Sequence, residues 1–209
     1  MKIVKNKTKL KIPVAEVTLS KKETDFITEV LTIELESKGG IGLAINQLED
    51  NSGLPVTGRA CILNVIDPLV LINPKIVKRS TDNIVYGEQC LSDDKSMKKP
   101  IKTVRSKRVT VECDNLGTVE FGPTQMIWNT KDEFFNDQGM LECACVQHEI
   151  DHLDGILMTD SSRKYTTTVT AGYKYGRNER VMVKLPDGST EFMKYKKAVP
   201  MLDTGCEIM

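Results

Sequence analysis

The sequence predicts an α+β fold with a helix near the N-terminus, a series of short strands, a second helix and a C-terminal β-hairpin. Three observations lead to this prediction. Apolar residues recur at helical spacing in residues 20–38 and again in residues 136–155. Runs rich in Ile, Val and Leu, broken by turn residues, lie between them. Two strand-like segments near the C-terminus flank the turn signal Pro-Asp-Gly-Ser.

The composition limits the size of the core and the classes of partner that the protein can have. With 209 residues, of which 40% are hydrophobic, the chain can bury one substantial core and a small appendage. The 29 basic and 29 acidic side chains balance, so no general charge favours nucleic acid or an anionic membrane. No apolar run has the length of a membrane span, and the first residues do not resemble a signal peptide. We therefore expect a cytoplasmic protein with no membrane partner, whose six cysteines are reduced.

The first helix has clear start and stop signals. Ser20 and Glu23 fit a capping box, and the pair Gly39-Gly40 ends the helical pattern. The apolar stripe between these signals consists of Phe26, Ile27, Val30, Leu31 and Leu35. Residues 40–47 are rich in turn formers, and the polar residues 49–59 predict a loop.

Strands are expected in the middle of the chain. Residues 61–77 favour short strands separated by bends at Pro68 and at Asn73-Pro74. Residues 109–121 alternate around the turn 114–117, which predicts a β-hairpin.

The second helix follows these strands. We expect it to begin at Asn136 or Asp137 and to end at Gly155. One stripe of this helix carries Met140, Leu141, Ala144, Cys145, His148 and His152. After a surface connection at residues 161–168, the segments 181–185 and 190–195 form the expected C-terminal hairpin.

The two histidines of the chain, His148 and His152, are both on the second helix. A spacing of four places both imidazoles on one helical face, where they can share one metal ion. Glu149 completes the pattern H-E-x-x-H, in which the carboxylate moves protons from metal-activated water. The pattern therefore predicts a catalytic metal site.

A third protein ligand is needed, because catalytic sites of this kind use three ligands and keep one position open. The acids that follow the motif are Asp154, Asp160 and Glu179, and a cysteine is the other alternative. Cys145 is on the same helix, and three ligands along one straight helix lie too far apart for a tetrahedral ion. A strand or loop must therefore supply the remaining ligand, and spacing alone leaves its identity open.

Three segments resemble motifs of the peptide deformylase family. Residues 88–92 (EQCLS) are similar to its E-G-C-L-S motif, with Gln89 in place of glycine. Residues 40–47 (GIGLAINQ) resemble G-x-G-L-A-A-x-Q, and residues 147–155 match Q-H-E-x-D-H-L-x-G. The three occur in the family's order. The resemblance implies antiparallel sheets around a central metal-binding helix, with a catalytic domain at 1–165 and an extension of unknown role at 166–209.

The resemblance also implies a reaction and a set of roles. Such enzymes remove the N-formyl group from the N-terminal formylmethionine of nascent polypeptides and release formate. It implies Cys90, His148 and His152 as metal ligands and Fe²⁺ as the working metal, with Zn²⁺ or Ni²⁺ able to occupy the site. Glu149 would be the general acid and base, and Gln47 with the Leu91 amide would stabilise the oxyanion.

Other expectations concern the surroundings of the site. By position, the methionine side chain would be bound by Ile41, Leu141, Ala144 and Cys145, next to the turn glycines Gly40 and Gly42. Glu88 is expected to pair with Arg105 and so to fix the ligand loop. The link 124–138, with Trp128, Phe134 and Phe135, is expected to shape the substrate entrance.

N-formylmethionyl peptides are the expected partners of a monomer, and the lysine-bearing tail allows a transient contact with the ribosome. Two other functions stay open. A metallopeptidase would use a downstream acidic ligand in place of Cys90. A deformylase-like domain without turnover would bind metal and use its tail for binding.

Overall fold

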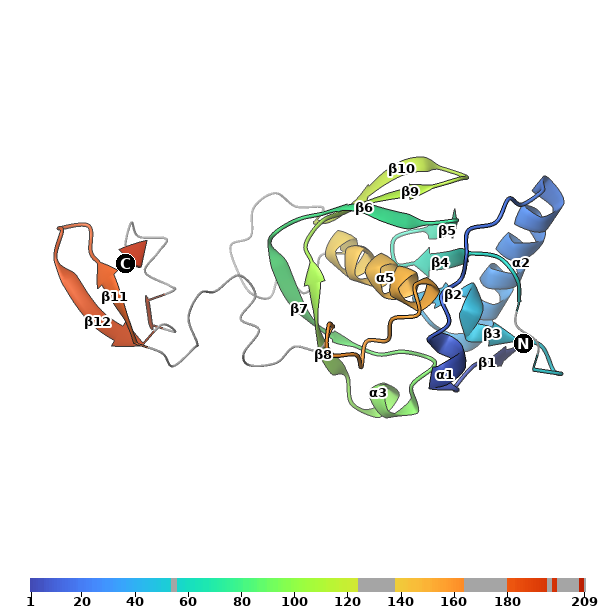
Figure 1. The fold of residues 1–209 in the computed structure, drawn as a ribbon, viewed down its shortest axis with the longest axis horizontal. Coiled ribbons are helices and arrows are strands. Elements are labelled where there is room, and N and C mark those ends of the chain that lie inside the picture. Colours follow the sequence, from blue (N-terminus) through green and yellow to red (C-terminus); the bar gives the residue numbers. More distant parts are fainter. Residues whose placement is uncertain (54–55, 124–137, 164–179, 195–196, 199–206, 209) are drawn as a thin grey trace. The chain divides into compact units, whose positions relative to one another are not determined.

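The structure is a computed structural model that describes residues 1–53, 56–123, 138–163, 180–194, 197–198 and 207–208 (Figure 1). The chain divides into two compact units, residues 1–164 and 165–209. Helices and antiparallel strands are both present, so the predicted α+β class is confirmed. No helix among the described residues has the length and hydropathy needed to cross a membrane.

The predicted N-terminal helix is α2 (Lys21–Lys38). Its capping box is formed, because the Ser20 hydroxyl accepts the Glu23 N–H and the Glu23 carboxylate accepts the Ser20 N–H. Gly39 ends the helix in the left-handed conformation, with φ of 68°. The face buried in the core consists of Ile27, Leu31 and Leu35.

The strands of the first unit form four small antiparallel sheets. Strand β1 (Lys2–Ile3) pairs with β3 (Leu48–Glu49). The other sheets are β2 (Gly42–Ala44), β4 (Ala60–Asn64) and β5 (Pro68–Ile72); β6 (Lys75–Arg79), β9 (Val109–Cys113) and β10 (Gly117–Phe121); and β7 (Asn83–Glu88) with β8 (Ile101–Ser106).

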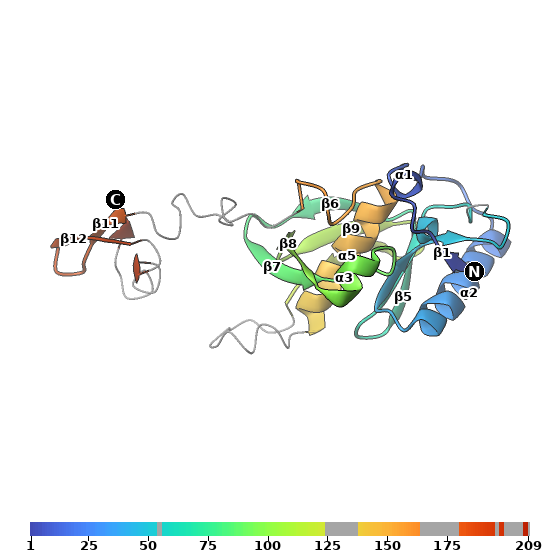
Figure 2. The ribbon, with the colours of Figure 1, turned by 90° about the horizontal axis from the view of Figure 1, so that it is seen from below.

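Helix α5 (Gln138–Leu153) occupies the centre of this unit (Figure 1). It contacts β2 and β4 and also β6, β8 and β10, whereas α2 packs against β2, β4 and β5 (Figure 2). Most of the buried apolar side chains of α2, β4 and α5 belong to one core cluster. The central helix surrounded by antiparallel sheets agrees with the predicted arrangement.

The two short connections in the middle of the chain form as expected. Asn73 has a φ of 50° and, with Pro74, separates β5 from β6. The turn at 114–117 joins β9 to β10. Two details of the prediction are wrong: Pro68 is the first residue of β5, and Glu49 belongs to β3 and not to the loop. Proline is tolerated at the start of a strand, where its missing N–H breaks no central hydrogen bond.

Among the described residues of the first unit, three short helical elements were not predicted. They are α1 (Lys7–Leu10), α3 (Asp94–Lys98) and the 3₁₀ turn η1 (Ile45–Gln47). Each is too short to show a helical period in the sequence.

Helix α5 ends two residues before the predicted Gly155, at Leu153. Gly155 has a φ of 71° in the turn that follows, and a Cβ there would stand 2.6 Å from the Lys11 carbonyl oxygen. Glycine is therefore needed to leave the helix at this point. The predicted start at Asn136 or Asp137 lies outside the described residues.

The second unit contains the predicted hairpin. Strand β11 (Arg180–Lys184) pairs with β12 (Thr190–Lys194), and the Asp187 carboxylate accepts the Ser189 N–H in the turn between them. A third strand that was not expected, β13 (Glu207–Ile208), pairs with the other edge of β11.

Candidate metal centre

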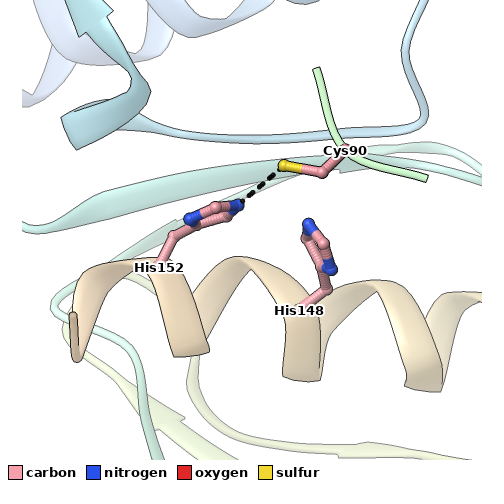
Figure 3. A group of neighbouring side chains, drawn as sticks. All are labelled: Cys90, His148 and His152. Carbon is pink, nitrogen blue, oxygen red and sulfur yellow. Dashed lines mark hydrogen bonds between the residues drawn. The ribbon is translucent and has the colours of Figure 1, made fainter. Parts of the chain in front are cut away.

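Three potential ligands from two separate segments meet beside α5 (Figure 3). His148 and His152 project from one face of the helix, and Cys90 comes from the loop after β7. The Cys90 Sγ atom lies 3.2 Å from the His152 Nε2 atom, and one ligand atom from each residue lies within 4.8 Å of the others. All three side chains are buried.

Hydrogen bonds hold the Cys90 loop in a tight turn. The Asp93 N–H donates to the Cys90 carbonyl at 2.9 Å, and the Cys90 N–H donates to the Ser96 hydroxyl at 2.9 Å. Ser96 is fully buried on α3. Gln89, at the position of the motif glycine, does not have positive φ, and its side chain donates to the Met97 carbonyl at 3.0 Å. The loop thus accommodates glutamine without backbone strain.

The donor set fits a divalent transition-metal ion. A thiolate and two neutral imidazoles suit several ions of intermediate softness. Burial lowers the pKa of His152 well below its usual range, which keeps this imidazole in the neutral form that binds metals.

Glu88 and Arg105 support the site from behind. The His148 Nδ1 atom lies 2.8 Å from Glu88 Oε2, and Arg105 donates to both Glu88 oxygens at 2.6 and 2.8 Å. The expected Glu88–Arg105 pair is therefore present. Burial alone would raise the pKa of Glu88, but the hydrogen bonds and charge of Arg105 hold it well below its usual range. The carboxylate stays ionised and orients the His148 ring.

Glu149 follows His148 on α5, and its carboxylate lies beside Gly42 of β2. It is buried, and within the described part of the chain its Oε2 atom has no hydrogen-bond partner. Burial, together with the negative charge of Glu88, raises its pKa to about 7. A carboxylate in such surroundings can accept and return a proton near neutral pH.

The Gln47 side chain is fixed at both ends. Its Oε1 atom accepts the Ala44 N–H at 2.8 Å, so its Nε2 group must point the other way. The Nε2 group donates to the Ser92 hydroxyl at 3.1 Å and lies 3.7 Å from Cys90 Sγ. Ser92, which sequence reasoning did not single out, therefore helps to aim an amide donor at the ligand cluster.

The residues expected around the substrate fall into two groups. Ile41 is 45% exposed, and its carbonyl accepts a hydrogen bond from Cys145 Sγ at 3.4 Å. Ala144 and the partly buried Leu141 instead pack with Met140 and with two residues of β7, Ile84 and Tyr86.

Gly40 and Gly42 lie on either side of Ile41, and the backbone there is tightly packed. A Cβ at residue 40 would stand 3.1 Å from Leu35 Cδ1 and 3.2 Å from Leu91 Cδ1. At residue 42 it would come within 2.5 Å of Cys145 Sγ and of Glu149 Oε1.

The alternative acidic ligands lie elsewhere. Asp154 pairs with Arg59 at 2.8 Å, and Asp160 pairs with Lys11 at 2.8 Å. Neither belongs to the ligand cluster, and Glu179 lies outside the described residues. Trp128, Phe134 and Phe135, expected at the substrate entrance, lie outside them as well.

The α+β fold, the buried Cys-His-His cluster and the adjacent carboxylate define a metal-binding hydrolase. Residues 1–167 match the model of the polypeptide deformylase family. The chain belongs to the peptide deformylase family, whose reaction is removal of the N-formyl group from nascent polypeptides with release of formate.

Individual relatives agree with this assignment. The chain is 30% identical over 180 residues to the peptide deformylase of Rhodopseudomonas palustris (strain TIE-1), covering 75% of this chain and 90% of that one. It is 35% identical over 127 residues to the enzyme of Rhizobium meliloti (strain 1021), covering 58% and 60% of the two chains.

Solved structures share the fold. Peptide deformylase 1B of Arabidopsis thaliana superposes with a TM-score of 0.60 at 22% identity, over 81% of this chain and 83% of that chain. The deformylase of the Vibrio parahaemolyticus bacteriophage VP16T gives a TM-score of 0.56 at 26% identity, over 75% and 99%.

Proposed function

We propose that Cys90, His148 and His152 bind Fe²⁺, and that Glu149, Gln47 and the Leu91 amide carry out the deformylation. The observation that best supports this assignment is the mutual approach of the three ligand atoms, within 4.8 Å, on a fold shared with peptide deformylases. Glu149 follows the first histidine directly, and its side chain is buried.

The metal would supply Lewis-acid chemistry, polarising the formyl carbonyl and acidifying a water molecule. One thiolate and two neutral imidazoles would leave a divalent ion with one net positive charge. Fe²⁺ is the ion implied by the family resemblance, and the same donors accept Zn²⁺ or Ni²⁺.

Glu149 would move the proton. Its buried carboxylate accepts a proton from the attacking water and returns it to the leaving α-amine. The products are formate and a free amino terminus. No second acid is required, because the same carboxyl group serves in both steps.

Gln47 and Leu91 would stabilise the negative charge that develops on the formyl oxygen. The Gln47 Nε2 group is held toward Cys90 by its contacts with Ala44 and Ser92. Such a preorganised donor stabilises the transition state by about 3 kcal/mol. The Leu91 N–H follows the ligand Cys90 in the chain and is the second donor.

Substrate recognition is assigned to the residues around Ile41. The backbone at Gly40 and Gly42 can approach a peptide closely, and Ile41 with Cys145 offers an apolar surface with a soft sulfur atom, which suits a thioether. Leu141 and Ala144, which pack beside β7, would form the second part of the recognition surface. Glu88 and Arg105 orient His148 without touching the substrate.

We also propose the organisation of the whole protein. Residues 1–165 form the catalytic domain of a cytoplasmic monomer, and residues 166–209 are an extension outside the chemistry. Any contact of the extension with the ribosome is transient. The lysines of residues 194–197 would provide its positive charge.

Formate release tests the proposal. Protein prepared anaerobically with Fe²⁺ should release formate from formyl-Met-Ala-Ser, and Glu149→Ala should bind the metal without turnover. A wild-type protein that binds metal and is folded but releases no formate would overturn the assignment. Retention of peptide cleavage by Cys90→Ala would point to the metallopeptidase alternative.

A further inference from the structure

A chain of buried charged groups continues from His148 away from the ligand cluster. Glu88 contacts His148 and is held by two hydrogen bonds from Arg105. Arg105 also donates through Nη1 to Asp151. The Glu88, Arg105 and Asp151 side chains are 8%, 1% and 2% exposed, so water can replace none of these contacts.

Arg163 completes this chain. Its Nε and Nη2 atoms donate to Asp151 Oδ2 and Oδ1, both at 2.7 Å, which is a two-point guanidinium–carboxylate contact. The Arg163 carbonyl accepts the Val104 N–H at 3.0 Å, next to Arg105 on β8. Both its backbone and its side chain are therefore fixed beside the network, and with 22% exposure it is the most accessible member.

The balance of charges explains how Arg163 can affect Glu88, a residue that it does not contact. Glu88 and Asp151 carry two negative charges, which Arg105 and Arg163 neutralise. Without Arg163, Arg105 would be the arginine left to donate hydrogen bonds to both buried carboxylates, and a buried carboxylate without its partner is costly. Arg105 would then move toward Asp151 and weaken the two hydrogen bonds that fix Glu88.

We propose that Arg163 is a positioning residue of the metal site: by binding Asp151 it leaves Arg105 free to hold Glu88, and Glu88 sets the orientation of the His148 ring. This inference rests on the proposed role of His148 as a ligand. It extends the support of the site beyond the three sequence motifs, to the last residue described before the second unit.

Cobalt binding by the full-length protein tests this role. Cobalt(II) has visible absorption bands that report the geometry of its ligands, and competition with a chromophoric chelator gives its affinity. Arg163→Gln should shift these bands and weaken Co²⁺ binding about tenfold, the lower end of the range for residues that support metal ligands. Arg108→Gln removes an exposed arginine near the same strands and should leave both readouts unchanged.

Two further variants separate positioning from general stability. The double variant Asp151→Asn with Arg163→Gln removes one charge of each sign, so Arg105 can return to Glu88, and the cobalt bands should move back toward those of the wild type. Arg163→Lys keeps the charge without the two-point contact and should bind Co²⁺ with intermediate affinity. If Arg163→Gln does not fold, the cobalt bands and Co²⁺ affinities of these two variants are compared with those of the wild type instead.

Two other results would overturn two different statements. A lower melting temperature of Arg163→Gln with wild-type cobalt bands and affinity would make Arg163 a structural residue only and would overturn the inference. Failure of the wild-type protein itself to bind Co²⁺ would instead overturn the ligand assignment.

Discussion

Gly42 on β2 lies so close to Glu149 on α5 that a Cβ atom at residue 42 would stand 2.5 Å from the Glu149 Oε1 atom. The same atom would be 2.5 Å from Cys145 Sγ. A methyl group at residue 42 would therefore displace the Glu149 carboxylate or the Cys145 side chain, and Glu149 is the residue that we propose for proton transfer.

Gly42→Ala should displace Glu149 and lower kcat by about 10²-fold, since a shift on the order of 1 Å in a catalytic group has this effect. The free energy of unfolding should fall by about 1–3 kcal/mol, because the new methyl group overpacks the core. Gly87→Ala on β7 is the matched control, since its Cβ would meet only Pro100 Cβ, at 3.4 Å. Steady-state kinetics and urea unfolding of both variants give the comparison. An unchanged kcat in Gly42→Ala would contradict the positioning role.

Gln47→Glu keeps an acceptor for the Ala44 N–H but removes the Nε2 donor. We expect kcat to fall by about 10²–10³-fold with little change in KM, as for the loss of an oxyanion donor. Ser92→Ala removes only the hydroxyl that orients this amide and should cost less. Equal effects of the two substitutions on kcat would argue against a direct role for Gln47.

Cys90→Ala should lose metal. Because the thiolate is one of three proposed ligands, elemental analysis after dialysis should find much less iron or zinc than in the wild type. Removal of metal from the wild type by a chelator should lower its melting temperature, and adding the ion back should restore it, since a ligand that binds only the folded state stabilises it. Cys143→Ala, which removes a buried cysteine outside the cluster, is the control for metal content.

Arg59→Met should destabilise the protein without touching the metal site. The buried Arg59 guanidinium donates to the carbonyls of Val14, Pro74 and Leu153 and to the Asp154 carboxylate. Its loss removes this donor from the Val14 and Pro74 carbonyls and should cost about 1–3 kcal/mol in urea unfolding. Asp154→Asn disturbs only the half-exposed partner and should cost less than about 1 kcal/mol. A loss below 1 kcal/mol for Arg59→Met would show that water replaces these contacts.

A protein that stops after residue 167, where the family match ends, should keep most of its kcat/KM on formyl-Met-Ala-Ser. The proposed catalytic groups all precede this point, and the two units are compact by themselves. Complete loss of activity in a folded, metal-loaded truncation would make the extension part of the catalytic fold.

The parts of the fold that could be predicted have local causes. Ser20 and Glu23 start α2, the turn at 114–117 forms a hairpin, and the pairing of β11 with β12 follows from the turn at 186–189. The short helix α3 had no such signal, because tertiary hydrogen bonds such as that of Ser96 with Cys90 stabilise it. Strand β13 adds to β11 from outside the hairpin, so no local turn predicts it.

The site residues also fall into those that the sequence alone predicts and those that only the fold brings together. The His148–His152 spacing places two groups on one helix face from sequence alone. Cys90 could be named only through motif resemblance, since the fold brings it to His152 from 62 positions away in the chain. Arg163 had no sequence signal, because its importance depends on Asp151 and Arg105, which it meets only after the chain has folded.

The burial of α5 on nearly every side also determines the order in which this enzyme can be assembled. All strands of the first unit precede α5 in the chain, so during synthesis their apolar faces emerge before the helix that covers them. The two imidazoles arrive on that same helix. Closure of the core and completion of the metal site therefore depend on the same helix, and a chain that ends before α5 has neither a finished interior nor the two histidines.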